Sequence, residues 1–291
     1  MGRYLERVEN TARLVASYEE LLLDLPQDAG LDWSLALKIL GDEAAYRENG
    51  GGDDELTFLL ASPDNLASLR AAIAYARENA RTSRDLLPSE SWQAINELHL
   101  ATRDLALSGA RLTDDIVARC HEISGILEGT MSHGQAYQFL RLGRSLERAD
   151  MTTRMIDVAA AILMSEGEEL VHYRNGIWRA VLRALSGFQA YRQTMRRAII
   201  AEHVMRFLLL DPCFPRSVLH CVNVLDAAAR ALPGGEDARA EVARLAASLE
   251  RVDPSSLSYA SVHEYVDEFQ VELGDLHGVI SETWLNPLAI G

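Results

Sequence analysis

Proline, the residue that most strongly interrupts helices, is missing from the long stretch between Pro88 and Pro212. Ala, Leu, Arg and Glu, all strong helix formers, dominate the sequence. Apolar residues recur at spacings of three and four, as at Leu5, Val8 and Ala12, and strict two-residue alternation is nowhere sustained. The sequence therefore predicts an all-α fold, a multi-helix bundle.

Caps and breakers divide this helical chain into segments. We expect the first helix to end near Leu23, ahead of Leu25-Pro26. Ser62-Pro63 predicts the start of another helix, with the serine as N-cap and the proline in the first helical position. The other expected helices cover residues 33–47, a segment from about Trp92, and residues 113–128, 135–165 and 175–200.

The second half of the chain repeats the first. Gly-Arg-Tyr-Leu-Glu-Arg at 2–7 recurs as Gly-Arg-Ser-Leu-Glu-Arg at 143–148, and Arg13 matches Arg154 at the same offset. Two further blocks recur in the same order, 33–47 as 178–192 and 58–68 as 207–217. Such self-similarity is typical of proteins built from repeated units.

This duplication predicts the domain organisation. We expect two tandem pseudo-symmetric helical repeats, residues 1–140 and 141–291. Because the sequence near residue 140 does not resemble a linker, we expect the repeats to pack together as one globular unit. Their first helices would then lie near the shared axis.

The repeated block carries a stripe of charged residues opposite its apolar face. Its candidate ligand-binding residues are Arg3, Arg7, Asn10, Arg13, Arg144, Arg148, Asp150 and Arg154. Leu14, Met151 and Met155 fall in the same stripe, and both copies keep the same arginines and glutamate where neighbouring positions differ. These two features favour a buried or cleft-lining network. A solvated face of ion pairs is the alternative.

Glu6 and Glu147 are the candidate catalytic residues of this network. A carboxylate that is buried without a partner is very costly, so each of them must pair with an arginine if the stripe is covered. Such pairs could form a clamp between the two halves. Alternatively, the surplus of arginines could hold a carboxylate or phosphate through bidentate hydrogen bonds.

Arg216 is a further candidate for ligand binding. We expect it in the first turns of a helix that follows Asp211-Pro212, where the helix dipole disfavours a cation. Its counterpart in the first repeat is Ala67, so Arg216 is not required by the repeated scaffold. A salt bridge to Asp211 is the alternative interpretation.

Composition and missing motifs exclude several classes of function. A net charge of −15 opposes binding to nucleic acid or to an anionic membrane, and no apolar run approaches the length of a membrane span. Cys120, Cys213 and Cys221 lack zinc-site spacing, and their odd number suits a reducing compartment. The histidines form no Glu-x-x-His or His-Glu-x-x-His motif, and nucleophile-elbow and phosphate-loop motifs are missing. We expect a cytoplasmic protein with no metal and no cofactor.

The repeated blocks, together with Leu-Leu-Leu-Asp-Pro-Cys-Phe-Pro-Arg-Ser at 208–217, resemble the bacterial Alpha-E family. This is an all-helical family of unknown function named for its Glu-Arg motif, and the resemblance covers essentially the whole chain. It implies that Pro215 and Arg216 belong to the family motif, together with the charged residues of both copies. It also implies that the usual family sequence starts somewhat upstream of Met1.

The resemblance implies a cellular context. Members are typically encoded beside, or fused to, ATP-grasp proteins and transglutaminase-like proteases. We therefore expect an accessory protein of an ATP-grasp peptide-ligation or peptide-modification system, which binds a peptide or amino-acid substrate or the ligase through an Arg/Glu-lined cleft. The alternatives are a transferase that uses Glu6 or Glu147 as general base, and a non-catalytic helical scaffold.

Overall fold

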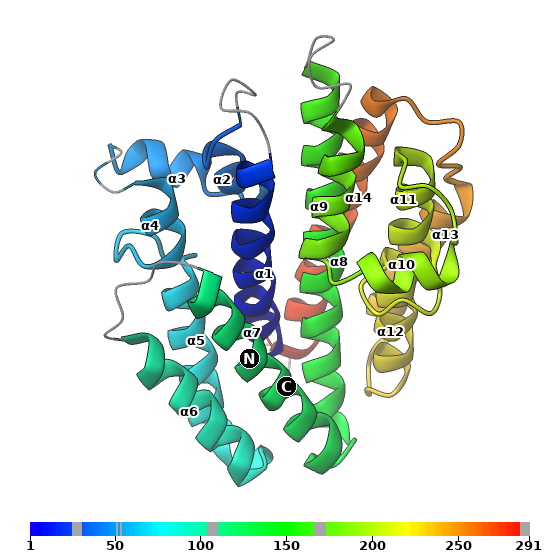
Figure 1. Ribbon diagram of the computed structural model, residues 1–291. Coiled ribbons are helices and arrows are strands. Elements are labelled where there is room, and N and C mark those ends of the chain that lie inside the picture. Colours follow the sequence, from blue (N-terminus) through cyan, green and yellow to red (C-terminus); the bar gives the residue numbers. More distant parts are fainter. Residues whose placement is uncertain (25–30, 51, 53, 104–109, 166–172, 286–291) are drawn as a thin grey trace. The chain divides into compact units, whose positions relative to one another are not determined.

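The protein is built from helices joined by turns (Figure 1). The computed structural model describes residues 1–24, 31–50, 52, 54–103, 110–165 and 173–285, and no strand occurs among them. The all-α prediction is confirmed. The chain divides into two compact units, Met1–Leu140 and Arg141–Gly291, which are unit 1 and unit 2 below.

Unit 1 is organised around its first helix. Helix α1 (Gly2–Asp24) packs against α5 (Leu69–Thr82) and α7 (Ala110–Thr130), and α6 (Ser89–Arg103) packs against both of these. Shorter elements complete the unit: α2 (Ser34–Leu40), α3 (Glu43–Glu48), α4 (Glu55–Leu60) and the 3₁₀ turn η2 (Arg84–Leu86). Leu5, Val8 and Ala12 point into the core, as their spacing predicts. Leu25 and Pro26, which we expected to end α1, lie outside the described residues.

Unit 2 contains most of the long helix α8 (Gln135–Ser165), which begins at the end of unit 1. Its other elements are α9 (Arg174–Ala184), α10 (Phe188–Thr194), α11 (Ala201–Leu210), α12 (Val218–Arg230), α13 (Glu236–Arg251), α14 (Tyr259–Ile280) and the π-helical turn η4 (Ser281–Leu285). Helix α12 packs against α11 and α13, and α13 packs against α14.

Two of the expected helices are each interrupted by a residue in the left-handed conformation. The prediction of one helix over 33–47 is wrong, because α2 ends at Gly41, whose φ is 78°. The prediction over 175–200 is wrong as well, because Ser186 adopts a φ of 55° between α9 and α10. In both places an N–H bonds to the carbonyl five residues back, Asp42 to Leu37 at 2.8 Å and Gly187 to Leu182 at 2.6 Å. This is the Schellman ending of a helix.

The helix expected to start at Ser62-Pro63 begins later. Helix α5 starts at Leu69, and its N-cap is Ser68, whose hydroxyl accepts from the Ala71 N–H. The preceding segment turns instead because Asn65 accepts from the Ala67 N–H and donates to Asp42 Oδ2 at 3.0 Å. Such side-chain bonds compete with helix formation.

The left-handed residues Gly41 and Ser186 allow a test of these two helix ends. Ser186→Gly should raise the free energy of unfolding by about 1 kcal/mol, because glycine adopts a positive φ without steric cost. Gly41→Ala should lower it by a similar amount. Urea denaturation of each variant measures both changes.

Gly125→Ala is the matched control, because this helical glycine has open space around its Cβ position. It should stabilise the protein by about 0.5–1 kcal/mol, since alanine has the higher helix propensity. Equal effects of Gly41→Ala and Gly125→Ala would contradict the assignment of Gly41 as a left-handed helix end.

Candidate functional site

Helices α1 and α8 are buried or half-buried along most of their length. No residue from Gly2 to Glu19, and none from Ala136 to Leu163, is exposed. A helix without an exposed face is normally apolar all round, yet these two helices carry the charged residues of the repeated block. Their charges must therefore be matched inside the protein.

The residues of the repeated block are buried or half-buried. Glu6 is 2% exposed and Glu147 is 3% exposed, and Asn10 is also buried. The half-buried members are Arg3, Arg7, Arg13, Arg144, Arg148, Asp150 and Arg154. Arg3, Glu6, Arg7, Asn10, Arg144, Glu147 and Arg148 each have an interaction partner. The burial agrees with the covered stripe that the sequence predicts and not with a solvated face.

In unit 1 the repeated block meets a histidine from α7. Arg13 Nε donates to Glu9 Oε1 at 3.0 Å, and Arg13 Nη2 lies 2.6 Å from His121 Nε2. His121 Nε2 is also 3.3 Å from Glu9 Oε1. His121 therefore lies against both members of the Arg13–Glu9 pair. His121 could not be predicted as a member of this group, since nothing in its local sequence pattern points to α1.

Unit 2 contains a matching ion pair on α8. Arg154 Nε donates to Asp150 Oδ2 at 2.9 Å, with the same one-turn spacing as the pair of Arg13 and Glu9. These are the residues that align in the two copies of the block. Arg13 is 16% exposed and Arg154 33% exposed, so both pairs are partly shielded from water.

Helix α8 also holds the loop that leads into α12. Thr152 Oγ1 donates to the Arg216 carbonyl at 2.8 Å in a buried contact, and Arg148 Nη1 makes a long contact of 3.4 Å to the Pro215 carbonyl. Within the loop, Asp211 Oδ1 accepts from the N–H groups of Cys213 and Phe214, both at 2.8 Å. Two motif segments that are far apart in sequence therefore meet in unit 2.

Arg216 lies before α12 and not in its first turns, which corrects the expected position. Ser217 is the N-cap of α12, and its hydroxyl accepts from the His220 N–H. Arg216 is 6% exposed and has an interaction partner. The hydrogen bond from Thr152 to the Arg216 carbonyl thus fixes the backbone at Arg216, whose side chain is buried.

A second basic feature of unit 2 runs from α9 to α11. Its arginines, all exposed, are Arg174, Arg179, Arg183, Arg192, Arg196, Arg197 and Arg206. Residues 174–206 contain one acidic residue, Glu202, in a chain whose net charge is −15. We call these seven side chains the arginine segment.

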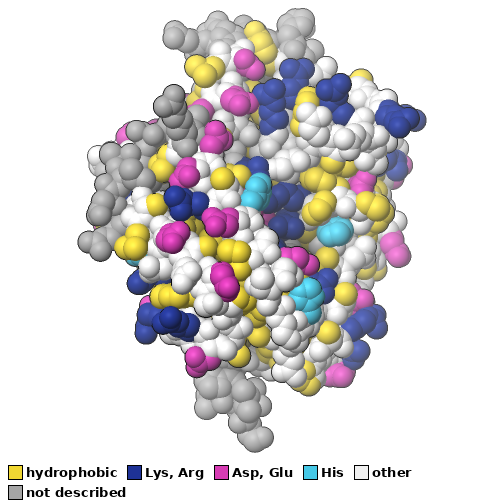
Figure 2. All heavy atoms as spheres, turned by 60° about the horizontal axis from the view of Figure 1, so that its bottom comes forward, with side chains coloured by type: hydrophobic (Ala, Val, Ile, Leu, Met, Phe, Trp, Pro, Cys, Tyr) yellow, Lys and Arg dark blue, Asp and Glu magenta, His cyan; other side chains and the backbone are white. Residues whose placement is uncertain are grey.

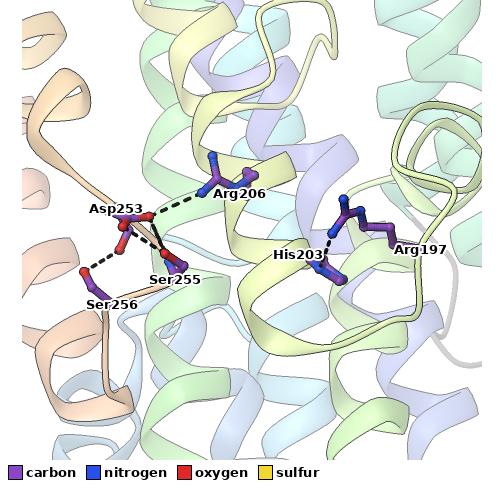
Figure 3. A network of polar contacts seen from close by, with 6 residues as sticks. All are labelled: Arg197, His203, Arg206, Asp253, Ser255 and Ser256. Atoms are coloured by element: carbon purple, nitrogen blue, oxygen red, sulfur yellow. Dashed lines mark hydrogen bonds and ion pairs between the residues drawn. The ribbon is translucent and has the colours of Figure 1, made fainter.

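Figure 3 shows two contacts of the arginine segment. Arg206 donates to Asp253 Oδ1 at 3.3 Å, and Arg197 Nη1 lies 3.5 Å from His203 Nε2. Hydrogen bonds from Ser255 hold the pKa of Asp253 below its usual value, with a smaller contribution from Arg206. On the face drawn in Figure 2, basic and acidic side chains are interspersed with hydrophobic ones.

The chain matches the family Alpha-E, described as a predicted alpha-helical domain with a conserved ER motif, over residues 1–285. Uncharacterized proteins of Mycobacterium bovis and Mycobacterium tuberculosis are 24% identical over 308 residues, covering 95% of this chain and 34% of theirs. The chain thus spans about a third of the length of these curated relatives. No solved structure matches the chain. Among the described helices, none has the length and apolar character needed to cross a bilayer.

The contact between α8 and the loop can be tested with two neighbouring threonines. Thr152→Val leaves the buried Arg216 carbonyl without its donor, so the free energy of unfolding should fall by about 1–3 kcal/mol. Thr153→Val is the matched control, because the hydroxyl of Thr153 bonds only within α8, to the Asp150 carbonyl. It should cost less than about 1 kcal/mol. Chemical denaturation measures both, and equal losses would mean that the loop contact adds no stability.

Proposed function

Because the chain belongs to the Alpha-E family of helical ER-motif domains, we propose that it is an accessory protein of a bacterial ATP-grasp peptide-ligation or peptide-modification system. In this role it binds the peptide or amino-acid substrate, or the ligase itself. The binding surface is lined by Arg and Glu side chains of the motif helices.

The observation that carries the proposal is the meeting of α8 with the loop before α12. It places the Arg148 side chain at the carbonyl next to Arg216, so two arginines of the family motif are anchored to one stretch of backbone. The guanidinium group of arginine is suited to bind carboxylates and acyl phosphates through paired hydrogen bonds. ATP-dependent peptide ligation consumes a carboxylate and passes through an acyl phosphate, so both groups occur in such a system.

The arginine segment supports an anionic partner independently. Seven exposed arginines lie in a segment that contains one acidic residue, Glu202, and of these arginines Arg206 is paired with Asp253 from outside the segment. The segment is thus locally positive in an acidic protein. The net charge of −15 disfavours nucleic acid, whereas a limited acidic surface on a protein partner fits this segment. A neighbouring ATP-grasp ligase or transglutaminase-like protease is such a partner.

We also propose that the two units are tandem pseudo-symmetric repeats. Three kinds of feature recur at positions that align in sequence: the one-turn ion pairs, the helix ends at Gly41 and Ser186, and the N-caps Ser68 and Ser217. One duplicated ancestor accounts for all three. On this proposal, the segments that lie between the matching sequence blocks also belong to the repeat.

Binding can be measured by titrating the full chain with glutamate, a glutamyl dipeptide, acetyl phosphate and ATP in a calorimeter, and by capture of the neighbouring ligase. Arg148→Gln should weaken binding of the carboxylate or acyl-phosphate probe about tenfold or more, because a charge-assisted hydrogen bond is lost. Arg230→Gln is the control, since this exposed arginine pairs with Asp226 on α12 away from the motif. No binding of any probe, combined with no capture of the ligase, would contradict the accessory role.

Burial of the motif glutamate favours a second function, a transferase in which Glu147, or Glu6 in the other copy, is the general base. Glu147→Gln keeps the side-chain shape and removes the negative charge. If Glu147 is a general base, turnover should be abolished while the melting temperature is unchanged. If the glutamate is a structural clamp in a non-catalytic scaffold, the melting temperature should fall by several degrees, about 2–4 °C for each kcal/mol lost. Differential scanning calorimetry and an activity assay on the same sample separate the two.

A further inference from the structure

Helix α8 carries one more acidic group beyond the repeated block. Asp157 has a side chain that is 13% exposed, and its neighbours Ile156 and Val158 are buried. The position that aligns with it in the first repeat is Ala16. The repeated scaffold therefore does not require a carboxylate at this position. Because the Asp157 carboxylate is largely shielded from water, it needs a positively charged or hydrogen-bonding partner.

That partner comes from α14. His263 Nδ1 is hydrogen-bonded to Asp157 Oδ1, and His263 Nε2 lies 3.8 Å from Asp267 Oδ2, one turn along α14. One ligand atom from each of the three residues lies within 4.8 Å of the others. Among the residues that the structure describes, this is the one group of at least three His, Cys, Asp or Glu side chains arranged in this way.

We propose that Asp157, His263 and Asp267 form a binding site for one divalent first-row metal ion, with Zn²⁺ bound more tightly than Mn²⁺. One imidazole nitrogen and two carboxylate oxygens are a common ligand set for such ions. Metal–ligand bonds of about 2.0–2.2 Å place two ligands of a tetrahedral site roughly 3.3 Å apart. Because one ion uses one imidazole nitrogen, the relevant spacing is the 4.8 Å within which one ligand atom of each residue lies. Closing this spacing needs a movement of about 1.5 Å toward the tetrahedral value, and the Asp267 side chain, which is 58% exposed, lies on the open side of the site.

The exposure of the three side chains fits an open coordination site. Asp157 is 13% exposed, His263 40% and Asp267 58%, so the site opens to solvent on the α14 side. An ion can enter from that side, and water can fill the remaining coordination position. The ion would also join α8, which carries the ER motif, to α14. This proposal departs from the sequence analysis, which expected no metal.

The test begins with the full chain stripped of metal by a chelator and titrated with Zn²⁺ by calorimetry. We expect one ion for each chain and a melting temperature that rises with Zn²⁺ concentration, because the ion binds the folded state. Co²⁺ in place of Zn²⁺ should give visible absorption bands of a tetrahedral or five-coordinate site. Mn²⁺ should bind more weakly than Zn²⁺.

Three variants remove one ligand each. Asp157→Asn, His263→Gln and Asp267→Asn should each weaken Zn²⁺ binding at least tenfold and abolish the Co²⁺ bands. His220→Gln is the matched control, a histidine of unit 2 whose Nδ1 lies 3.0 Å from the Pro212 carbonyl. Because Asp267 is exposed, Asp267→Asn tests the site even if Asp157→Asn fails to fold.

Two results would overturn the proposal. The first is that the wild-type chain binds neither Zn²⁺ nor Co²⁺, in which case the three residues form a hydrogen-bonded group only. The second is that Asp267→Asn and His263→Gln bind Zn²⁺ as tightly as the wild type, which would place the ion elsewhere. Neither result bears on ligase capture, so the metal site and the proposed function fail separately.

Discussion

The structure depends on one constraint: helix α8 has no exposed residue between Ala136 and Leu163, yet it is not apolar. Each polar group on it must therefore find a partner inside the protein, since a buried polar atom without one is costly. Thr152 bonds to the loop before α12, Asp150 to Arg154 on the same helix, and Asp157 to α14. These partners account for the way in which α8 connects to the surrounding elements of unit 2.

The contacts to the loop are made to backbone carbonyls and not to side chains. Thr152 and Arg148 therefore fix the path of the chain at Pro215 and Arg216 without using the Arg216 guanidinium. Ser217 then begins α12 directly after the fixed residues. A fixed backbone at Arg216 limits the positions that its buried side chain can reach, and such preorganisation favours affinity. This is the physical reason to propose a binding function for this part of the protein.

The fold class and the longest helix could be predicted from the sequence, because they follow from proline positions and periodicity. The expected range 135–165 agrees with α8. The break at Ser186 could not be predicted, because a serine adopts a positive φ there that its residue type disfavours. The break at Gly41 had a sequence signal, since glycine is the residue that most often ends a helix in this conformation. At the candidate site, the covered stripe was visible as a mixture of charged and apolar residues. His121 and His263 were not, because each meets its partner across more than a hundred residues, 108 and 106 respectively.

Differences between the two units identify residues that the shared helical framework does not require. Positions with the same role in both units, such as the ion pairs of α1 and α8, are explained by the stability of the shared helical framework. Arg216 and Asp157 stand where the first copy has Ala67 and Ala16, so the framework folds without them. Burying a polar group costs free energy of folding. A buried polar residue that the framework does not need is therefore expected to have a role other than stabilising that framework. On the duplication proposed above, Arg216 and Asp157 are therefore polar residues that distinguish unit 2 from unit 1.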